Sequence, residues 1–272
     1  MIGLRRAADV ESLLTIAVTI GALAVTAGGL CRHPGLYVLS VLGCYRCCVI
    51  NHNHQHLPIM VGSAANQVLT VLLSAVIGLP GSVLIPLHNR NHHQANNRPD
   101  DAMSTAHLRL RRAWLRLFAY PLVAAVRWAP RRRALLARLA VDEPWLHRRI
   151  RVEQIAILVA LLAAILAGGW QGAVALLLPW TLAQYWVVNA NYIQHHGCDS
   201  DDPDACVRTF TGRLLNWFTM NGGYHLVHHQ RPEIHWRDLA AMHEARVPAA
   251  APHQVEPSMP AWLWRHLTGR AP

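Results

Sequence analysis

Histidine is the residue type that first suggests chemistry in this sequence, because many of its 18 copies gather in tight clusters. Imidazole is the commonest metal ligand in proteins. Side chains three or four residues apart lie on one face of a helix, as His52 and His56 would. The histidines that we expect to bind metal are His52, His56, His88, His92, His93, His195, His225, His228 and His229.

These histidines are too numerous for a single metal ion, which takes about four to six ligands. Each cluster also lies at or just beyond the end of an apolar segment, so four helix ends that met on one face would bring the imidazoles together. Neutral, nitrogen-rich sites suit iron, zinc or copper. The sequence therefore predicts a site for two metal ions.

The elements that position these clusters are apolar enough to indicate a membrane protein. The 272 residues (30.3 kDa) are 53% hydrophobic and only 15% charged, whereas soluble domains carry about 25% charge. This composition excludes a disordered chain, and six cysteines are too few for a disulfide-stapled secreted fold. We expect one all-α integral-membrane domain over residues 1–272, with about four transmembrane helices at 13–30, 36–51, 154–166 and 173–189.

The apolar stretch at 68–87 needs a different interpretation. If it crossed the bilayer, the clusters before and after it would lie on opposite faces and could not share a metal site. It contains Gly78-Leu79-Pro80-Gly81, a strong helix breaker. We therefore expect a re-entrant or interfacial hairpin that returns to the starting face, with tight turns elsewhere at 31–35 and 168–172.

The net charge of +10 fits the positive-inside rule better than nucleic-acid binding, for which no motif is visible. Arginines are dense between Arg109 and Arg151, where we expect helices on the cytoplasmic membrane surface. With four crossings, both termini and every histidine cluster fall on this cytoplasmic side. All basic residues are Arg and none is Lys, which we attribute to a GC-rich bacterial genome, so we expect the inner membrane.

Several other residues have weaker claims to the site. His54, His196 and His235 are of uncertain role, and Asp100, Asp101 and Glu233 could hold ligand histidines through their second ring nitrogen. Asn221 is expected either to orient a ligand near the metals or to cap a helix. Cys44, Cys47 and Cys48 are read as apolar helix residues. We interpret the isolated histidines as surface residues: His33, His107, His147, His243, His253 and His266.

The combined pattern His-x3-His, His-x3-His-His and His-x2-His-His resembles the membrane fatty acid desaturase and hydroxylase superfamily. Residues 88–93 are similar to the second histidine motif of alkane hydroxylases and carotenoid ketolases, and residues 221–229 to the third motif of bacterial acyl desaturases. Residues 191–195 resemble the Asn-Tyr-x-Glu-His element of alkane hydroxylases, with Gln194 in place of the Glu. The resemblance extends from the second predicted span to Trp236.

The resemblance implies an integral-membrane, non-haem enzyme with two iron ions and O2 as co-substrate. It further implies oxidation of an unactivated C–H bond in a lipid chain and a separate electron donor of the ferredoxin or rubredoxin type. We expect fatty acyl desaturation; the alternative is a hydroxylase or ketolase of an alkane, terpenoid or other lipid. A membrane metal transporter is a remote alternative, since transporter sites interrupt helices near the bilayer midplane.

Overall fold

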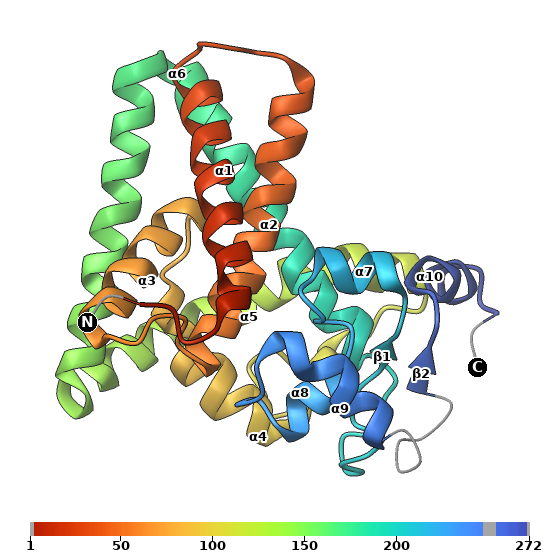
Figure 1. Ribbon diagram of the computed structural model, residues 1–272. Coiled ribbons are helices and arrows are strands. Elements are labelled where there is room, and N and C mark those ends of the chain that lie inside the picture. The colour runs from red at the N-terminus through yellow and green to blue at the C-terminus, as the bar shows by residue number, and fades with distance from the viewer. Residues whose placement is uncertain (1–2, 247–253, 271–272) are drawn as a thin grey trace. The chain divides into compact units, whose positions relative to one another are not determined.

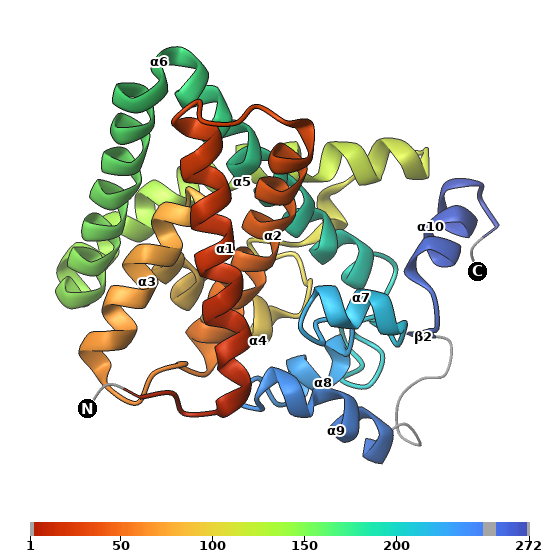
Figure 2. The same cartoon turned by 45° about the horizontal axis from the view of Figure 1, so that its top comes forward.

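The computed structural model describes residues 3–246 and 254–270, which are mostly helical (Figures 1 and 2). Contacts divide the chain into two compact units. Unit 1 comprises Met1–Leu84 and Leu135–Val187, and unit 2 comprises Ile85–Ala134 and Val188–Pro272. The predicted all-α class is confirmed in this coarse form, since the described strands, β1 (Thr209–Phe210) and β2 (Val255–Glu256), have two residues each.

Unit 1 contains long apolar helices. The short helix η1 (Ala7–Asp9) leads into α1 (Val10–Ala27), and α1 packs along α2 (Pro34–His56), which in turn contacts α3 (Ser63–Ile77) (Figure 1). Pro34 starts α2, and the His33 ring accepts a hydrogen bond from the Gly35 amide as the N-terminal cap. Residues 7–27, 34–56 and 144–195 are long and apolar enough to cross a membrane.

Helix α6 (Pro144–His195) bends where a tight turn was expected. Gly169 has φ 63° and ψ −148°, a conformation that only glycine adopts readily, and it separates two helical arms. The arms approach closely there, because a Cβ atom on Gly172 would lie 2.1 Å from the Ala164 carbonyl oxygen. Each arm exceeds the roughly 20 residues that a membrane span requires.

The expected break in the stretch 68–87 is confirmed. Helix α3 ends at Ile77, and the next residue, Gly78, has φ 67° and closes the helix in the left-handed conformation. Two carbonyls at the C-terminal end of α3 find partners within unit 1: Trp180 Nε1 donates to Val76 O and Gln184 Nε2 donates to Ile77 O, both at 2.8 Å. These two side chains therefore help an interrupted helix to end inside the apolar bundle, because they pair two of its last carbonyls.

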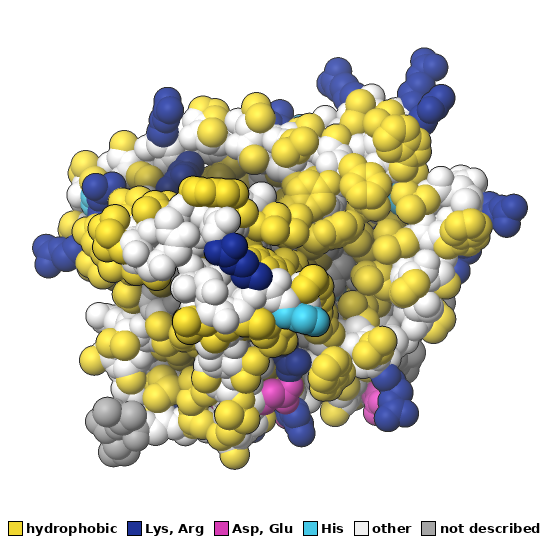
Figure 3. All heavy atoms as spheres, turned by 90° about the horizontal axis from the view of Figure 1, so that it is seen from above, with side chains coloured by type: hydrophobic (Ala, Val, Ile, Leu, Met, Phe, Trp, Pro, Cys, Tyr) yellow, Lys and Arg dark blue, Asp and Glu magenta, His cyan; other side chains and the backbone are white. Residues whose placement is uncertain are grey.

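The surface of unit 1 is apolar along its helices. Leu158, Leu162 and Leu166 recur every four residues on α6, and Leu166 is 79% exposed. On the face that carries the α1–α2 turn and the α6 bend, hydrophobic side chains cover most of the surface and acidic ones are few (Figure 3). Such a surface is typical of helices that face lipid.

Unit 2 holds shorter elements around the ends of two long helices. After η2 (Gly81–Val83) of unit 1, the chain forms a π-helix, η3 (Ile85–His92), then α4 (His93–Ala95), η4 (Thr105–His107) and the start of α5 (Ala113–Asp142). The end of α6 leads to α7 (Arg213–Phe218), α8 (His225–Gln230), η5 (Trp236–Asp238), α9 (Leu239–Arg246) and α10 (Met259–Leu267). Strands β1 and β2 pair in parallel, and Tyr120, Tyr192, Phe210 and Trp262 fill the core.

Candidate metal centre

Four histidines of unit 2 form a compact group that we call the buried group: His92, His195, His225 and His229. Each offers a ring nitrogen, and these nitrogens all lie within 4.8 Å of one another. They come from η3, from the last residue of α6 and from α8. Three elements that are distant in the sequence thus supply one potential metal site.

Asp101 fixes the orientation of the His92 ring. The His92 Nδ1–H donates to Asp101 Oδ2 at 2.7 Å, and both residues are almost fully buried. Burial alone would raise the pKa of Asp101, but the hydrogen bond and charge of His92, with the Met103 and Asn97 amides, hold this pKa below its usual value. A carboxylate that binds Nδ1 leaves Nε2 unprotonated for a metal ion.

The Nε2 atoms of the buried group converge. His195 Nε2 lies 3.2 Å from His92 Nε2 and 3.1 Å from His225 Nε2. With the Nδ1–H of His92 donating to Asp101, the His92 Nε2 is the ring atom that faces these neighbours. Lone pairs that face one another at this distance repel unless a proton or a cation lies between them, so the arrangement fits a bound metal ion.

The ring of His229 is oriented in the same way as the ring of His92, through a hydrogen bond at Nδ1. Its Nδ1–H donates to Asn96 Oδ1 at 2.9 Å, which leaves Nε2 as the ligating atom. This Nε2 is shielded from solvent and has no hydrogen-bond partner among the described residues. Burial, and then the surrounding histidines, hold the pKa of His229 well below its usual value, so the ring is neutral.

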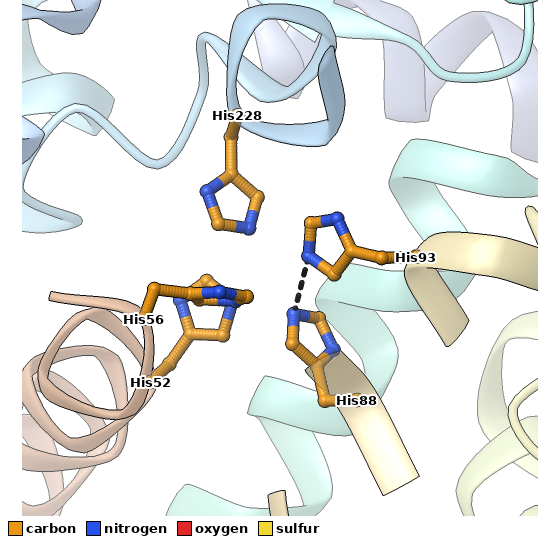
Figure 4. A group of neighbouring side chains, drawn as sticks. All are labelled: His52, His56, His88, His93 and His228. Atoms are coloured by element: carbon orange, nitrogen blue, oxygen red, sulfur yellow. Dashed lines mark hydrogen bonds between the residues drawn. The ribbon is translucent and has the colours of Figure 1, made fainter. Parts of the chain in front are cut away.

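A second set in unit 2, the open group, consists of His88, His93 and His228, whose offered nitrogens also lie within 4.8 Å of one another. Figure 4 shows the three rings turned toward one another, with His88 Nε2 and His93 Nε2 3.0 Å apart. The His93 and His228 ring centroids are 4.8 Å apart. This group is less buried than the first, since His88 and His93 are partly exposed and His228 is buried.

The π-helix determines which histidines pair. The spacing of His88 and His92 places their rings together, stacked with centroids 5.1 Å apart, but His88 Nε2 also meets His93 Nε2, five residues on, while His92 Nε2 lies near His195 Nε2. A π-helix has i to i+5 hydrogen bonds and a wider turn than an α-helix, so His88 can contact both the fourth and the fifth residue after it. This irregular backbone lets a single segment supply both groups.

His52 and His56 lie on α2, in unit 1. They project from the same side of the helix, as their spacing predicts, and their ring centroids are 5.0 Å apart (Figure 4). Both rings are partly exposed within the structure.

The histidines of uncertain role do not belong to either group. His54 is buried, accepts from the Ile59 amide at Nδ1 and donates from Nε2 to Thr70 Oγ1, so both nitrogens are engaged. His196 stacks on Tyr192, and His235 caps η5 through Nδ1.

Some expectations for single residues were wrong. His243 and His266 are buried at 5% and 8% exposure rather than being surface residues. Asn221 does not cap α8, whose N-cap is Tyr224; its side-chain amide donates to the Trp236 carbonyl, and its role near the metals stays a prediction. Asp100 is exposed, and Glu233 is exposed and pairs with Arg231, so of the three candidate acids only Asp101 contacts a clustered histidine among the described residues. His253 lies outside the described residues.

The cysteines of α2 have ordinary packing roles. Cys44 Sγ donates to Val76 O, and Cys47 Sγ lies 3.7 Å from Thr19 Oγ1. Both thiols are buried and free, as expected for cysteines that act as apolar helix residues.

Comparison with known families shows the family to which the chain belongs. None of the curated proteins compared with the chain matches it. The family model described as fatty acid desaturase matches residues 31–260, which includes every histidine of both groups together with His52 and His56. This match covers most of the sequence, and the chain belongs to the fatty acid desaturase family.

Proposed function

We propose that this chain is a membrane-bound, O2-dependent di-iron oxidase whose reaction is the desaturation of a fatty acyl chain. Membership of the family gives the general activity, a desaturase- or hydroxylase-type oxidation of a lipid chain in a membrane context. The observation that carries the specific proposal is the convergence of two imidazole groups in unit 2, with Asp101 directing the His92 ring.

The proposed ligand set contains nine histidines. The buried group would hold one iron ion. His88, His93 and His228 would hold the other, completed by His52 and His56 of α2. The spacing of His52 and His56 on one helix face supports this assignment, as does the match of the family model across both units.

The chemistry supplied by a bound di-iron group is the activation of O2 for removal of hydrogen from an unactivated methylene. The protein's own residues orient the proposed ligands and exclude water. Asp101 and Asn96 fix the tautomers of His92 and His229 so that unprotonated Nε2 atoms face inward. His92 and His195 are 1% and 0% exposed, so the site excludes water, which would otherwise intercept reactive species.

Electrons would come from a separate protein of the ferredoxin or rubredoxin type. We propose that it docks on the arginine-rich surface of α5, since a basic face attracts an acidic partner. The positive-inside rule puts this surface, both termini and the metal centre on the cytoplasmic side of a bacterial inner membrane, with four crossings.

A labelling experiment tests this orientation. Cys31, in the turn between α1 and α2, is the exposed cysteine among the free thiols, while Cys44, Cys47 and Cys48 are buried. A membrane-impermeant maleimide added to intact spheroplasts should label the wild type but not Cys31→Ser. Labelling that requires lysis would contradict the proposed orientation.

Metal analysis combined with product analysis tests the reaction. Purified protein in detergent should contain about two iron ions per chain and little zinc. After reduction and exposure to O2 with a panel of acyl chains, mass spectrometry should find a product lighter by two hydrogen atoms. A product heavier by one oxygen atom would indicate a hydroxylase. Absence of iron, or metal transport into vesicles without O2 consumption, would overturn the oxidase assignment.

A further inference from the structure

His195 is held in the buried group by different means from two of its neighbours. His92 and His229 each donate from Nδ1 to a side-chain oxygen, that of Asp101 and that of Asn96. The Nδ1 atom of His195 is shielded from solvent and has no hydrogen-bond partner among the described residues. No side-chain hydrogen bond at Nδ1 orients this ring, so its placement depends on packing and on the main chain that carries it.

That main chain is the last turn of α6, and the last four carbonyls of a helix have no partner within the helix. Arg208, from the segment between α6 and β1, binds the carbonyls on both sides of His195. Its Nη1 donates to the Ile193 carbonyl at 2.8 Å, and its backbone amide donates to the Gln194 carbonyl at 2.6 Å. Its Nη1 and Nη2 each lie 3.4 Å from the His196 carbonyl oxygen. One residue thus holds the turn before and after the histidine.

The carbonyl of His195 itself has other partners. The backbone amide of Cys198 donates to it at 3.2 Å, and Asn97 Nδ2 donates to it at 3.4 Å. Asn97 is fixed in turn, because its Oδ1 accepts from the Thr105 amide at 2.6 Å and its own amide donates to Asp101 Oδ2 at 2.9 Å. The end of α6 and the loop that carries Asp101 therefore belong to one hydrogen-bonded network.

Arg208 is itself held rigidly. It is 8% exposed, and its guanidinium lies 4.3 Å from the centre of the Trp262 ring. Trp262 stacks in turn on His266, with ring centroids 4.7 Å apart. Among the described residues, the hydrogen bonds of this guanidinium go to main-chain carbonyls. A cation that binds the last carbonyls of a helix is also favoured by the helix dipole.

We infer that Arg208 is the positioning residue of His195, because it fixes the last turn of α6 so that His195 Nε2 points into the buried group. Arg208 contacts neither the metal ion nor the substrate and acts through the main chain. The inference rests on the proposed function, since it takes the buried group as a metal site. It separates two ways of placing a ligand: a hydrogen bond to the ring for His92 and His229, and a hold on the backbone for His195.

Metal binding by the full-length protein in detergent tests this without turnover. Arg208→Ala should lower the iron(II) affinity of the buried group about tenfold or more, as expected when a residue that orients a ligand is removed, while the open group keeps its affinity. Competition with a chelator measures both affinities. The matched control is Arg112→Ala, an exposed arginine that lines the same cleft of about 1010 Å³ as Arg208, and it should change affinity less than about twofold.

Chemical rescue separates positioning from general stability. Because Arg208 lines this cleft beside exposed residues such as Arg112, a small cation in solution can reach the space that Arg208→Ala creates. Millimolar guanidinium chloride should restore most of the lost iron affinity, whereas methylammonium chloride at the same concentration should not, since only guanidinium has the planar fork of donors. Arg208→Lys keeps the charge without the fork, so its iron affinity should fall between those of the wild type and Arg208→Ala.

The inference is overturned if Arg208→Ala binds both metal ions as tightly as the wild type, or if Arg112→Ala loses as much affinity. It is also overturned if both groups lose affinity together and guanidinium restores neither. If Arg208→Ala does not fold, Arg208→Lys carries the test, and wild-type affinity at its buried group would count against the inference. A wild type that binds no metal overturns the proposed function and this inference with it, whereas two tightly bound ions in both the wild type and Arg208→Ala refute the role of Arg208 alone.

Discussion

The two imidazole groups of unit 2 differ in how completely that unit forms them. All four histidines of the buried group come from unit 2, three of them are classed as buried, and Asp101 and Asn96 orient two of the rings. The open group has three histidines in unit 2, of which two are partly exposed. The buried group is thus preorganised, while the open group depends on ligands from α2 in our proposal.

Histidines that are neighbours in the sequence belong to different groups. His92 and His93 are adjacent, as are His228 and His229, yet each pair is divided between the two groups. Adjacent residues on a helix point in directions about 100° apart. A His-His pair can therefore serve two metal ions at once.

The largest effect on iron content and turnover should follow from His195→Gln, which removes the most buried of the proposed ligands. We expect loss of about one iron ion per chain and a fall in turnover greater than the 10–100-fold typical of outer-shell changes. Elemental analysis and product formation measure both. If His195→Gln retained full iron and activity, the buried group would not be a metal site.

The double variant His52→Gln and His56→Gln should empty the open group and leave the buried group loaded. The reason is that His88, His93 and His228 alone supply fewer than the usual four ligands. Iron content should again fall by about one ion per chain, with activity lost. Retention of both ions in this variant would exclude α2 as a source of ligands.

A smaller effect is expected for Asp101→Asn, which weakens the fixed tautomer of His92. Iron affinity of the buried group should fall about 10- to 100-fold, as measured by competition with a chelator, while the open group is unchanged. Asp100→Asn is the matched control, because Asp100 is exposed and adjacent in the sequence. Equal losses in the two variants would mean that general negative charge, rather than the hydrogen bond to His92, matters.

The smallest effect on metal binding should come from His54→Asn. His54 lies between His52 and His56, but its two nitrogens bond the Ile59 amide and the Thr70 hydroxyl. We expect about 1–3 kcal/mol less stability from the unpaired buried groups, seen as a lower thermal midpoint, with unchanged iron content. Loss of iron from a protein that remains folded would show that His54 belongs to the site.

The sequence alone determined which residues could bind metal and which segments could lie in a membrane. Apolar composition predicted the helices, and glycine and proline predicted the break after Ile77 and the bend at Gly169, because these depend on local backbone preferences. The histidine spacing was specific enough to indicate the family that the model match then showed.

The division of the histidines between the two groups, and the residues that surround them, depend on tertiary packing. The π-helix that carries His88 and His92 was not predicted by the spacing, and the contacts of His195 with His92 and His225 join elements far apart in the chain. Likewise, Arg208 and His266 face one cleft because α10 packs near the end of α6. Periodicity gives the face of a single helix, but packing between distant helices decides which faces meet.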